Sequence, residues 1–275
     1  MLKASPDPNF IVTYLAVHCA GAVAVPLEKD MPDDRFQAFT TRLSDTKTEA
    51  PADNPSEAIA DVLFTTGSTG AQKGVMISHR ALLADADNLI QAQGFTEETV
   101  FVICGPLNHF GSLSKLWPTF IKGGTIILLD GMKDQSAFFH AFDYPGNKFT
   151  TFLVPASIRL LLLYGKEPLG RLADKIDFIE TGGAALSQTD MDNTIACKGE
   201  TLMSGYLNDP ALTSAVYHDD TVFTTDLGAI DKAGNLHILG RNNAVINIGG
   251  YKVSPEEIEN AALTCPEILF WAIVS

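Results

Sequence analysis

The sequence predicts an α/β fold with mostly parallel sheets, because short apolar runs alternate with helical patterns along most of its 275 residues. Strands are expected over residues 60–65, 100–104, 125–129, 149–154 and 175–181. Helical patterns precede or separate these runs, over residues 10–19, from Ser78 onward, over 113–121 and over 157–164. This alternation is typical of parallel sheets, whose crossover connections are usually helices.

Other stretches complete the expected organisation. Residues 22–25 read as a short strand after the first helix, and residues 44–57 are polar and contain proline, which indicates a loop. A hairpin-turn composition at residues 231–234 precedes a strand candidate at 235–239. Ser254 opens a capping box, with proline at the first helical position and glutamate three residues after the cap, and therefore predicts a helix start.

The composition is that of a globular protein with a substantial core, with 46% hydrophobic and 19% charged residues. This excludes a disordered or low-complexity chain. The 19 basic residues are outnumbered by 33 acidic ones, which gives a net charge of -14. A surface this acidic repels phosphate backbones and anionic lipid headgroups, so we expect no nucleic-acid partner and no membrane-surface binding. A small nucleotide remains compatible, because backbone amides and one or two cations can override the global field locally.

The four cysteines, Cys19, Cys104, Cys197 and Cys265, are scattered without the CxxC spacing of a zinc site. We expect reduced thiols, no structural zinc and a cytoplasmic protein. The N-terminus lacks the long apolar run of a signal peptide. No run of about 18 uninterrupted apolar residues is present, so no transmembrane segment is expected.

The strongest local signal for chemistry is residues 65–74, which read Thr-Thr-Gly-Ser-Thr-Gly-Ala-Gln-Lys-Gly. Glycines allow backbone amides to turn toward phosphate oxygens, the hydroxyls add donors and Lys73 adds a cation. We expect this loop between a strand and the helix that begins at Ser78, where open α/β sheets bind ligands. It does not fit the P-loop pattern G-x-x-x-x-G-K-[ST], because Gly74 follows the lysine. The alternative is a plain Gly/Ser/Thr linker.

The loop resembles the phosphate loop of the adenylate-forming superfamily, which contains acyl-CoA synthetases, peptide-synthetase adenylation domains and luciferases. Gln72 stands where that family usually has proline. Five further stretches resemble the family's landmarks, in the family's order. They are the acyl-pocket segment at 106–109, the glycine-rich strand end at 181–186, the Gly-Tyr stretch at 198–208, the Thr-Gly-Asp-like motif at 224–228 and the hinge region at 240–259. Together these landmarks cover nearly the whole chain.

The resemblance implies a fold and a set of site residues. The implied fold is a large adenylation domain of several subdomains over residues 1–241, followed by the beginning of a small, mobile α+β domain at 242–275. Lys73 and Thr69 would act in catalysis, and His109 and Gly183 would line the acyl pocket. The residues implied in ATP or AMP binding are Thr65, Thr66, Gly67, Ser68, Thr69, Gly70, Lys73, Gly182, Gly183, Ala184, Asp226 and Arg241.

The implied activity is ATP-dependent conversion of a fatty or aryl acid into an acyl-adenylate, followed by transfer of the acyl group to the thiol of CoA. ATP, Mg²⁺ and CoA are therefore the implied cofactors and co-substrates; a carrier protein is the alternative acceptor, and a homodimer is one possible assembly. In the resembling peptide-synthetase adenylation domains, an aspartate just after the pocket segment typically holds the α-amino group of the substrate. None follows His109 here, so the resemblance disfavours an amino-acid substrate. A kinase would need a magnesium carboxylate and a base near Lys73, and no such pair is evident beyond Asp226.

Three departures from the family pattern stand out. The Tyr-Gly-x-Thr-Glu motif, whose glutamate binds magnesium in the family, is absent where Met191 meets Asp192. The stretch from residue 39 to 61 is too short for a full strand–helix–strand unit, and the sequence ends before the catalytic lysine of the C-terminal domain. Deletions through a buried sheet should destroy the fold, so we expect internal segments to be missing from this sequence. The alternative is a naturally shortened, non-catalytic nucleotide-binding relative.

Overall fold

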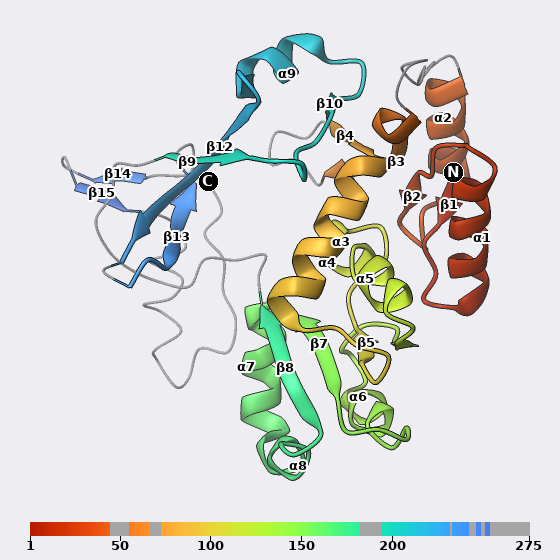
Figure 1. Ribbon diagram of the computed structural model, residues 1–275, viewed down its shortest axis with the longest axis vertical. Coiled ribbons are helices and arrows are strands. Elements are labelled where there is room, and N and C mark those ends of the chain that lie inside the picture. Colours follow the sequence, from red (N-terminus) through yellow and green to blue (C-terminus); the bar gives the residue numbers. More distant parts are fainter. Residues whose placement is uncertain are drawn as a thin grey trace. The chain divides into compact units, whose positions relative to one another are not determined.

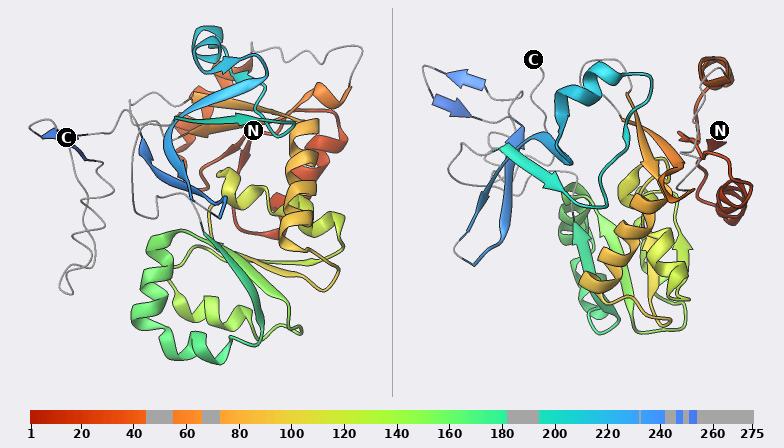
Figure 2. Two further views of the ribbon diagram at one scale, coloured as in Figure 1. Left: turned by 60° about the vertical axis from the view of Figure 1, so that its left-hand side comes forward. Right: turned by 45° about the horizontal axis from the view of Figure 1, so that its top comes forward.

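The computed structural model describes residues 1–44, 55–65, 73–181, 194–231, 233–241, 246–248 and 251–253. The chain divides into two compact units (Figures 1 and 2). Unit 1 comprises Met1–Gly183 and Glu200–Ser214, and unit 2 comprises Ala184–Gly199 and Ala215–Ser275. The expected domain boundary at residue 241 therefore lies inside the second unit.

Unit 1 is built around a four-stranded parallel sheet of β5 (Val100–Ile103), β6 (Thr125–Leu128), β7 (Phe149–Leu153) and β8 (Ile176–Thr181), in the order β6-β5-β7-β8. The sequence predicts all four of these strands, and each is one residue shorter at one end than its predicted run. The α/β class is thus confirmed, with its parallel pairing concentrated in this sheet.

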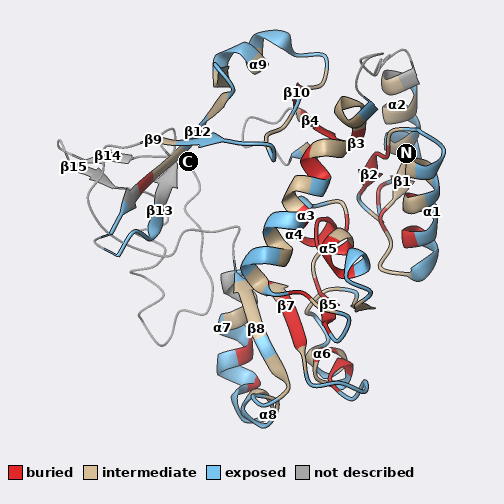
Figure 3. Cartoon of the chain, in the orientation of Figure 1, coloured by how far each residue is buried: buried red, intermediate tan, exposed pale blue. Residues whose placement is uncertain are grey.

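Both faces of the parallel sheet are covered by helices, as the apolar side chains on both faces of its central strand β5 require. Phe101 and Ile103 face a buried cluster that includes residues of α1 (Pro8–Cys19), α3 (His79–Gln93) and α5 (Leu116–Ile121). Val100 and Val102 face the opposite cluster, which includes residues of α6 (Gln135–Ala141) and α7 (Pro155–Tyr164). Figure 3 shows the buried strands at the centre of this arrangement. A short helix, α8 (Lys166–Arg171), follows α7.

The local helix signals act as the sequence indicates, with one exception. The Ser78 side chain caps α3 by accepting from the amide of Ala81 at 3.2 Å, and the helix ends at Gly94 with a φ of 68°. The single helix expected over 113–121 is instead divided into α4 (Phe110–Leu113) and α5. Pro118 explains the break, because proline lacks the amide that a continuous helix needs and is tolerated only in a first turn.

The second sheet of unit 1 has three antiparallel strands, β10 (Gly205–Tyr206), β4 (Lys73–Ser78) and β3 (Ile59–Thr65). Two short parallel strands, β1 (Leu2–Lys3) and β2 (Pro26–Leu27), lie in the same unit, and the strand expected at 22–25 is reduced to an isolated bridge at Ala24. The remaining described elements of this part are α2 (Asp33–Ser44) and the 3-10 turn η1 (Pro55–Glu57).

A buried polar network joins β3 to the neighbouring helices. Asp61 is fully buried; its Oδ2 accepts from the hydroxyl of Tyr14 at 2.7 Å, and its Oδ1 lies 3.2 Å from Nε2 of His18. The indole of Trp117 donates to the Tyr14 hydroxyl at 3.3 Å. Burial, together with the negative charge of Asp61, raises the pKa of Tyr14 well above its usual value. The phenol therefore stays protonated and continues to donate to the carboxylate.

Unit 2 is described mainly as antiparallel strands: β9 (Thr194–Lys198), β11 (Tyr217–His218), β12 (Thr221–Ile230), β13 (Leu236–Arg241), β14 (Ile246–Ile248) and β15 (Tyr251–Val253). Helix α9 (Pro210–Val216) runs across the unit boundary. The predicted turn before β13 is present: Asp231 accepts from the amides of Ala233 and Asn235, each at 2.9 Å. The predicted helix after Ser254 lies outside the described residues.

Membrane-spanning helices and the state of the cysteines can be described for the same ranges of the chain. Within those ranges, no helix has the length and apolar character needed to cross a bilayer. The cysteines in the same ranges, Cys19, Cys104 and Cys197, are free thiols.

Candidate functional site

The phosphate-loop candidate joins two antiparallel strands. Thr65 ends β3 and pairs in register with Lys73, the first residue of β4. Residues 73–78 form a strand before the helix begins, which corrects the expectation that the helix directly follows the loop. The alternation of the sequence Lys-Gly-Val-Met-Ile-Ser could have revealed this strand, but its short length conceals the pattern. The hairpin therefore holds both ends of the loop at a fixed separation.

Strand β10 completes the base of this hairpin and brings a tyrosine to Lys73. The amide of Leu207 donates to the carbonyl of Gly74 at 2.7 Å, and the ring of Tyr206 lies 5.9 Å from the Lys73 ammonium. A Cβ at Gly74 would lie only 3.1 Å from the side chains of Leu207 and Val62, so glycine permits the close approach of β10. The Tyr206 ring gives the ammonium an attractive surface. Sequence reasoning missed this role for Tyr206.

Several predicted residues lie outside the described part of the chain. They are the loop residues Thr66, Gly67, Ser68, Thr69 and Gly70, and the strand-end residues Gly182, Gly183 and Ala184. The junction of Met191 and Asp192, where the glutamate motif is missing, lies in an undescribed range as well. Their assigned roles stay predictions.

In unit 2 the structure brings two predicted nucleotide-binding residues together. Asp226 on β12 pairs in register with Arg241 on β13. The hydroxyl of Thr224 donates to the carbonyl of Ile195 at 2.8 Å and accepts from the amide of Asp226 at 3.1 Å. This bridge fixes the backbone of Asp226 relative to β9. Asp226 therefore lies in a strand whose backbone is fixed by pairing on both sides.

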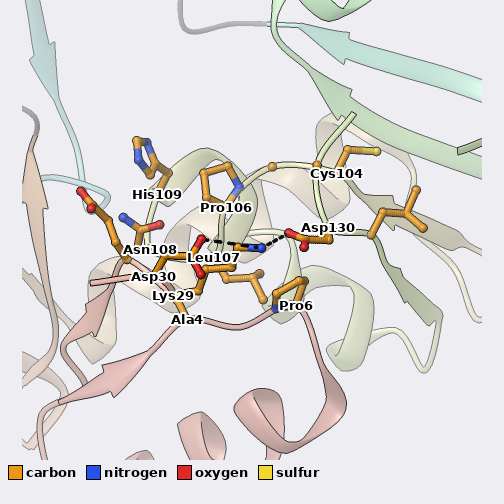
Figure 4. Close-up of a pocket in the computed structure, with 14 residues that line it drawn as sticks. Ala4, Pro6, Lys29, Asp30, Cys104, Pro106, Leu107, Asn108, His109 and Asp130 are labelled. Carbon is orange, nitrogen blue, oxygen red and sulfur yellow. Dashed lines mark hydrogen bonds and ion pairs between the residues drawn. The ribbon is translucent and has the colours of Figure 1, made fainter. Parts of the chain in front are cut away.

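His109 is exposed, and it lines a pocket of about 340 Å³ in unit 1 (Figure 4). The pocket is formed by segments that follow β1, β2, β5 and β6, with an apolar floor that includes Leu107 and Leu129. Ligands of open α/β sheets bind at the carboxyl ends of parallel strands. The sequence predicted a pocket-lining role only for residues 106–109, because the other walls come from segments far apart in the chain.

The pocket has acidic walls. The Lys29 ammonium is ion-paired with Asp130 and lies 4.0 Å from Asp30, and Glu28 contributes a third carboxylate. With one lysine against three carboxylates, this pocket disfavours a phosphate group. Cys104 also lines the pocket, and burial raises the pKa of its thiol to about 11. That thiol is therefore protonated and unreactive near neutral pH.

Helix α4, which begins after His109, packs closely on the end of β7. A Cβ at Gly111 would lie 3.1 Å from the ring of Phe152, so a larger residue there would push α4 away from the sheet. The Lys115 ammonium lies 5.7 Å from the centre of the same ring. The start of α4 is therefore held against the carboxyl end of the parallel sheet.

The described residues contain no preformed metal site, although Mg²⁺ often binds through only one or two protein carboxylates together with substrate phosphates. No group of three His, Cys, Asp or Glu side chains in those ranges has the geometry to hold a metal ion. Lys73 and Thr65, in contrast, fit a phosphate, since they present a cation and a hydroxyl at the two ends of the loop.

Comparison with known proteins assigns the chain to a family. The family described as AMP-binding enzyme matches residues 38–206, which is more than half of the chain. The chain therefore belongs to the AMP-binding enzyme family. The matched range contains Thr65, Lys73 and His109, whereas Asp226 and Arg241 lie beyond it.

The relatives include proteins named as CoA ligases. The chain is 24% identical to 4-coumarate–CoA ligase 3 of Oryza sativa subsp. japonica over 308 residues, covering 86% of this chain and 55% of that protein. It is 25% identical to the medium-chain fatty-acid–CoA ligase of Escherichia coli (strain K12), covering 89% and 56%. The chain thus spans about half the length of these relatives. The 308-residue alignment exceeds the 275 residues of this chain, so the rice protein has residues there without a counterpart here.

Solved structures show the same fold. ATP-bound MatB from Rhodopseudomonas palustris has a TM-score of 0.79 at 21% identity, covering 96% of this chain and 72% of that one. O-succinylbenzoate coenzyme A synthetase (MenE) from Bacillus subtilis, in complex with AMP, has a TM-score of 0.76 at 20% identity, covering 92% and 71%. At these identities the likeness establishes that this chain shares the fold of these structures.

Proposed function

We propose that this protein activates a carboxylic acid with ATP to form an acyl-adenylate and transfers the acyl group to CoA. The observation that carries this proposal is the in-register pairing of Thr65 with Lys73, which places a hydroxyl and a cation at the two ends of the loop within the family-matched range. Activation is needed because a carboxylate repels nucleophiles and has no good leaving group. Joining it to AMP supplies that leaving group.

Each residue has a proposed task in this reaction. The Lys73 ammonium and the Thr65 hydroxyl orient the phosphates, and Lys73 offsets the negative charge that develops on departing pyrophosphate. The undescribed loop residues, including Thr69, add donors. In unit 2, the Asp226 carboxylate accepts from the ribose hydroxyls, and Arg241 binds the nucleotide. Mg²⁺ is the proposed metal cofactor, which would offset phosphate charge, and no described residue is assigned to it as a ligand.

The proposed acid is a fatty or aryl acid, with His109 and Gly183 lining its pocket. Support comes from relatives named for 4-coumarate and for medium-chain fatty acids. The absence of an aspartate directly after His109 argues against an amino acid. CoA is the proposed acceptor, a carrier protein is the alternative, and the cytoplasm is the proposed compartment. The proposed domain division remains an adenylation domain over 1–241 and the start of a mobile domain at 242–275.

ATP–pyrophosphate exchange with the purified chain tests this function. Octanoate and 4-coumarate should each be compared with phenylalanine and with no acid, and the adenylate should be trapped with hydroxylamine. We expect exchange with at least one of the two acids and none with phenylalanine. A Lys73→Ala variant that exchanges as fast as the wild type would show that the site is misassigned. Robust exchange with phenylalanine would overturn the choice of substrate class.

A second candidate function is non-catalytic nucleotide binding. Two observations favour it: the aligned relative has residues without a counterpart in this chain, and the Tyr-Gly-x-Thr-Glu motif is absent from the sequence. This candidate predicts that AMP binds, as measured by calorimetry, while neither exchange nor hydroxamate is detected with any acid. The intact mass of the purified chain serves as the control, because a mass far above 29.6 kDa would mean that the missing segments are present.

A further inference from the structure

A buried lysine stands beside the start of α5 without any role in the chemistry proposed above. Lys115 is only 3% exposed, although lysine is among the residue types that are least often buried. Its Nζ donates to Oε1 of Glu180 at 2.8 Å, and the exposed fractions of the two side chains are 4% and 24%. The pair is therefore a largely desolvated ion pair.

The partner carboxylate is held from two sides. The second oxygen of Glu180, Oε2, accepts from Nε2 of Gln93 on α3 at 3.0 Å. Asp85, also on α3, faces the same cluster. Burial raises the pKa of Asp85, the positive charge of Lys115 opposes that rise and the negative charge of Glu180 adds to it. The cluster thus joins α3, the α4–α5 junction and β8.

Such a pair is a weak source of stability. Removing two charges from water costs about as much as their attraction returns, and replacing a buried ion pair with apolar residues is often neutral or stabilising. What the pair does provide is a fixed distance between two particular backbones. Lys115 lies just after α4, and Glu180 is the penultimate residue of β8.

Both backbones lead toward the ligand-binding end of the sheet. Glu180 lies at the carboxyl end of a parallel strand, where ligands of such sheets bind. The Lys115 ammonium and Gly111 of α4 both lie against the ring of Phe152, near the end of β7. The pair therefore connects α4, which follows the acyl-pocket candidate His109, to the end of β8. An anionic substrate that binds nearby would meet Glu180 already neutralised by Lys115.

We propose that Lys115 and Glu180 are positioning residues for the acid substrate: their ion pair holds the carboxyl end of β8 against α4 and neutralises a carboxylate beside the acid-binding region. This inference rests on the proposed acid-activating function. Neither residue needs to touch the acid. The loss of charge balance acts mainly on the anionic acid, whereas a shift of the end of β8 also affects the nucleotide, because the proposed nucleotide-binding residues Gly182 and Gly183 directly follow this strand.

The test compares three variants by the KM for octanoate and for ATP in pyrophosphate exchange. Lys115→Met leaves Glu180 unneutralised, and we expect the KM for octanoate to rise about tenfold, as for one uncompensated charge in a partly desolvated site, and to rise clearly more than the KM for ATP. The double variant Lys115→Met/Glu180→Leu removes both charges and should recover most of the loss. Lys122→Met, which removes an exposed lysine just after α5, is the matched control and should behave as wild type.

Two results would overturn the positioning role. One is a double variant as impaired as Lys115→Met; the other is a parallel rise in both KM values, since a general loss of folding would produce it. Hydrogen exchange gives a readout that does not depend on catalysis. In folded Lys115→Met the amides of Glu180 and Thr181 should exchange faster than in the wild type, and unchanged exchange there would refute the inference. A wild-type protein without acid-dependent exchange would refute the proposed function, while the amide measurement would still decide on the ion pair.

Discussion

Two antiparallel sheets carry the described nucleotide-site candidates, and they differ in what holds them. In unit 1, Thr65 and Lys73 pair on the β3–β4 hairpin, whose apolar side chains are buried: Val62 is 2% exposed and Leu63 is 6% exposed. In unit 2, Asp226 and Arg241 pair on β12 and β13, where Leu236 is 54% exposed. Each sheet presents a matched pair of residues, but only the first rests on a packed core in the described structure.

The difference concerns how strand register is fixed. A slip of one residue on β3 would turn buried apolar side chains outward, so burial specifies the register of the hairpin. On β12 and β13 little burial is at stake, and the register depends on backbone pairing and on the Asp231 turn. We therefore expect the unit 1 pair to respond to core mutations and the unit 2 pair to respond to changes at its turn and bridges.

The largest expected effect comes from truncating a buried side chain in the unit 1 sheet, compared with truncating an exposed one in the unit 2 sheet. Leu63→Ala should reduce the free energy of unfolding by about 2–5 kcal/mol, because it removes packing from a nearly closed site. Leu236→Ala should change it by less than about 0.5–1 kcal/mol, because that side chain is already largely in water. Urea denaturation measures both. Equal losses in the two variants would erase the contrast between the sheets.

The second prediction concerns the cation of the hairpin. Lys73→Ala should slow adenylation about 100-fold, the usual cost of removing one group that stabilises developing charge. The measurement is the rate of pyrophosphate exchange at saturating ATP, with Lys122→Ala as the control for loss of a positive charge. A rate within twofold of the wild type would remove Lys73 from the catalytic role.

Cysteine labelling tests the packed core of unit 1 by comparing the reactivity of buried Cys104 with that of exposed cysteines. Because burial raises the pKa of Cys104 to about 11, its thiolate fraction at pH 8 should be about 100-fold below that of an ordinary cysteine. Exposed Cys19 and Cys197 should react with iodoacetamide, while Cys104 should react only after unfolding. Peptide mapping by mass spectrometry separates the sites. Rapid labelling of Cys104 in the native protein would contradict the packed core of unit 1.

The fourth prediction addresses unit 2. Asp226→Ala should raise the KM for ATP about tenfold, because the ribose hydroxyls would lose a charged acceptor. Asp226→Asn, which keeps an acceptor oxygen without the charge, should fall between the wild type and the alanine variant. Calorimetric titration with AMP gives an independent readout. Unchanged affinity in both variants would limit Asp226 to a structural part in the sheet.

The smallest expected effect tests the ring below Lys73. Tyr206→Leu should reduce adenylation about two- to fivefold, the amount expected for a partly exposed cation–π contact, whereas Tyr206→Phe keeps the aromatic face and should leave the rate unchanged. Pyrophosphate exchange measures both variants. If phenylalanine is as damaging as leucine, the ring is not what holds the ammonium.

The sequence predicted most of the parallel sheet correctly, because the strands of a sheet covered on both faces are rich in apolar residues and can be recognised without knowledge of their partners. It also located the start of α3, since Ser78 is a local helix-start signal. It missed β4, because six residues with partial alternation are ambiguous, and it did not separate α4 from α5. Among the site residues, Thr65, Lys73, Asp226 and Arg241 lie in strands, and the remaining loop residues lie outside the described part.

The sequence by itself determined the family and the candidate phosphate loop, because a glycine- and hydroxyl-rich motif and the order of short landmarks are local properties of the chain. Only the tertiary structure decided what stands beside them. The pairing of Thr65 with Lys73, the ring of Tyr206 near that ammonium and the burial of Lys115 against Glu180 join residues up to 133 positions apart. Such contacts depend on which surfaces the fold brings together, and no local pattern records that.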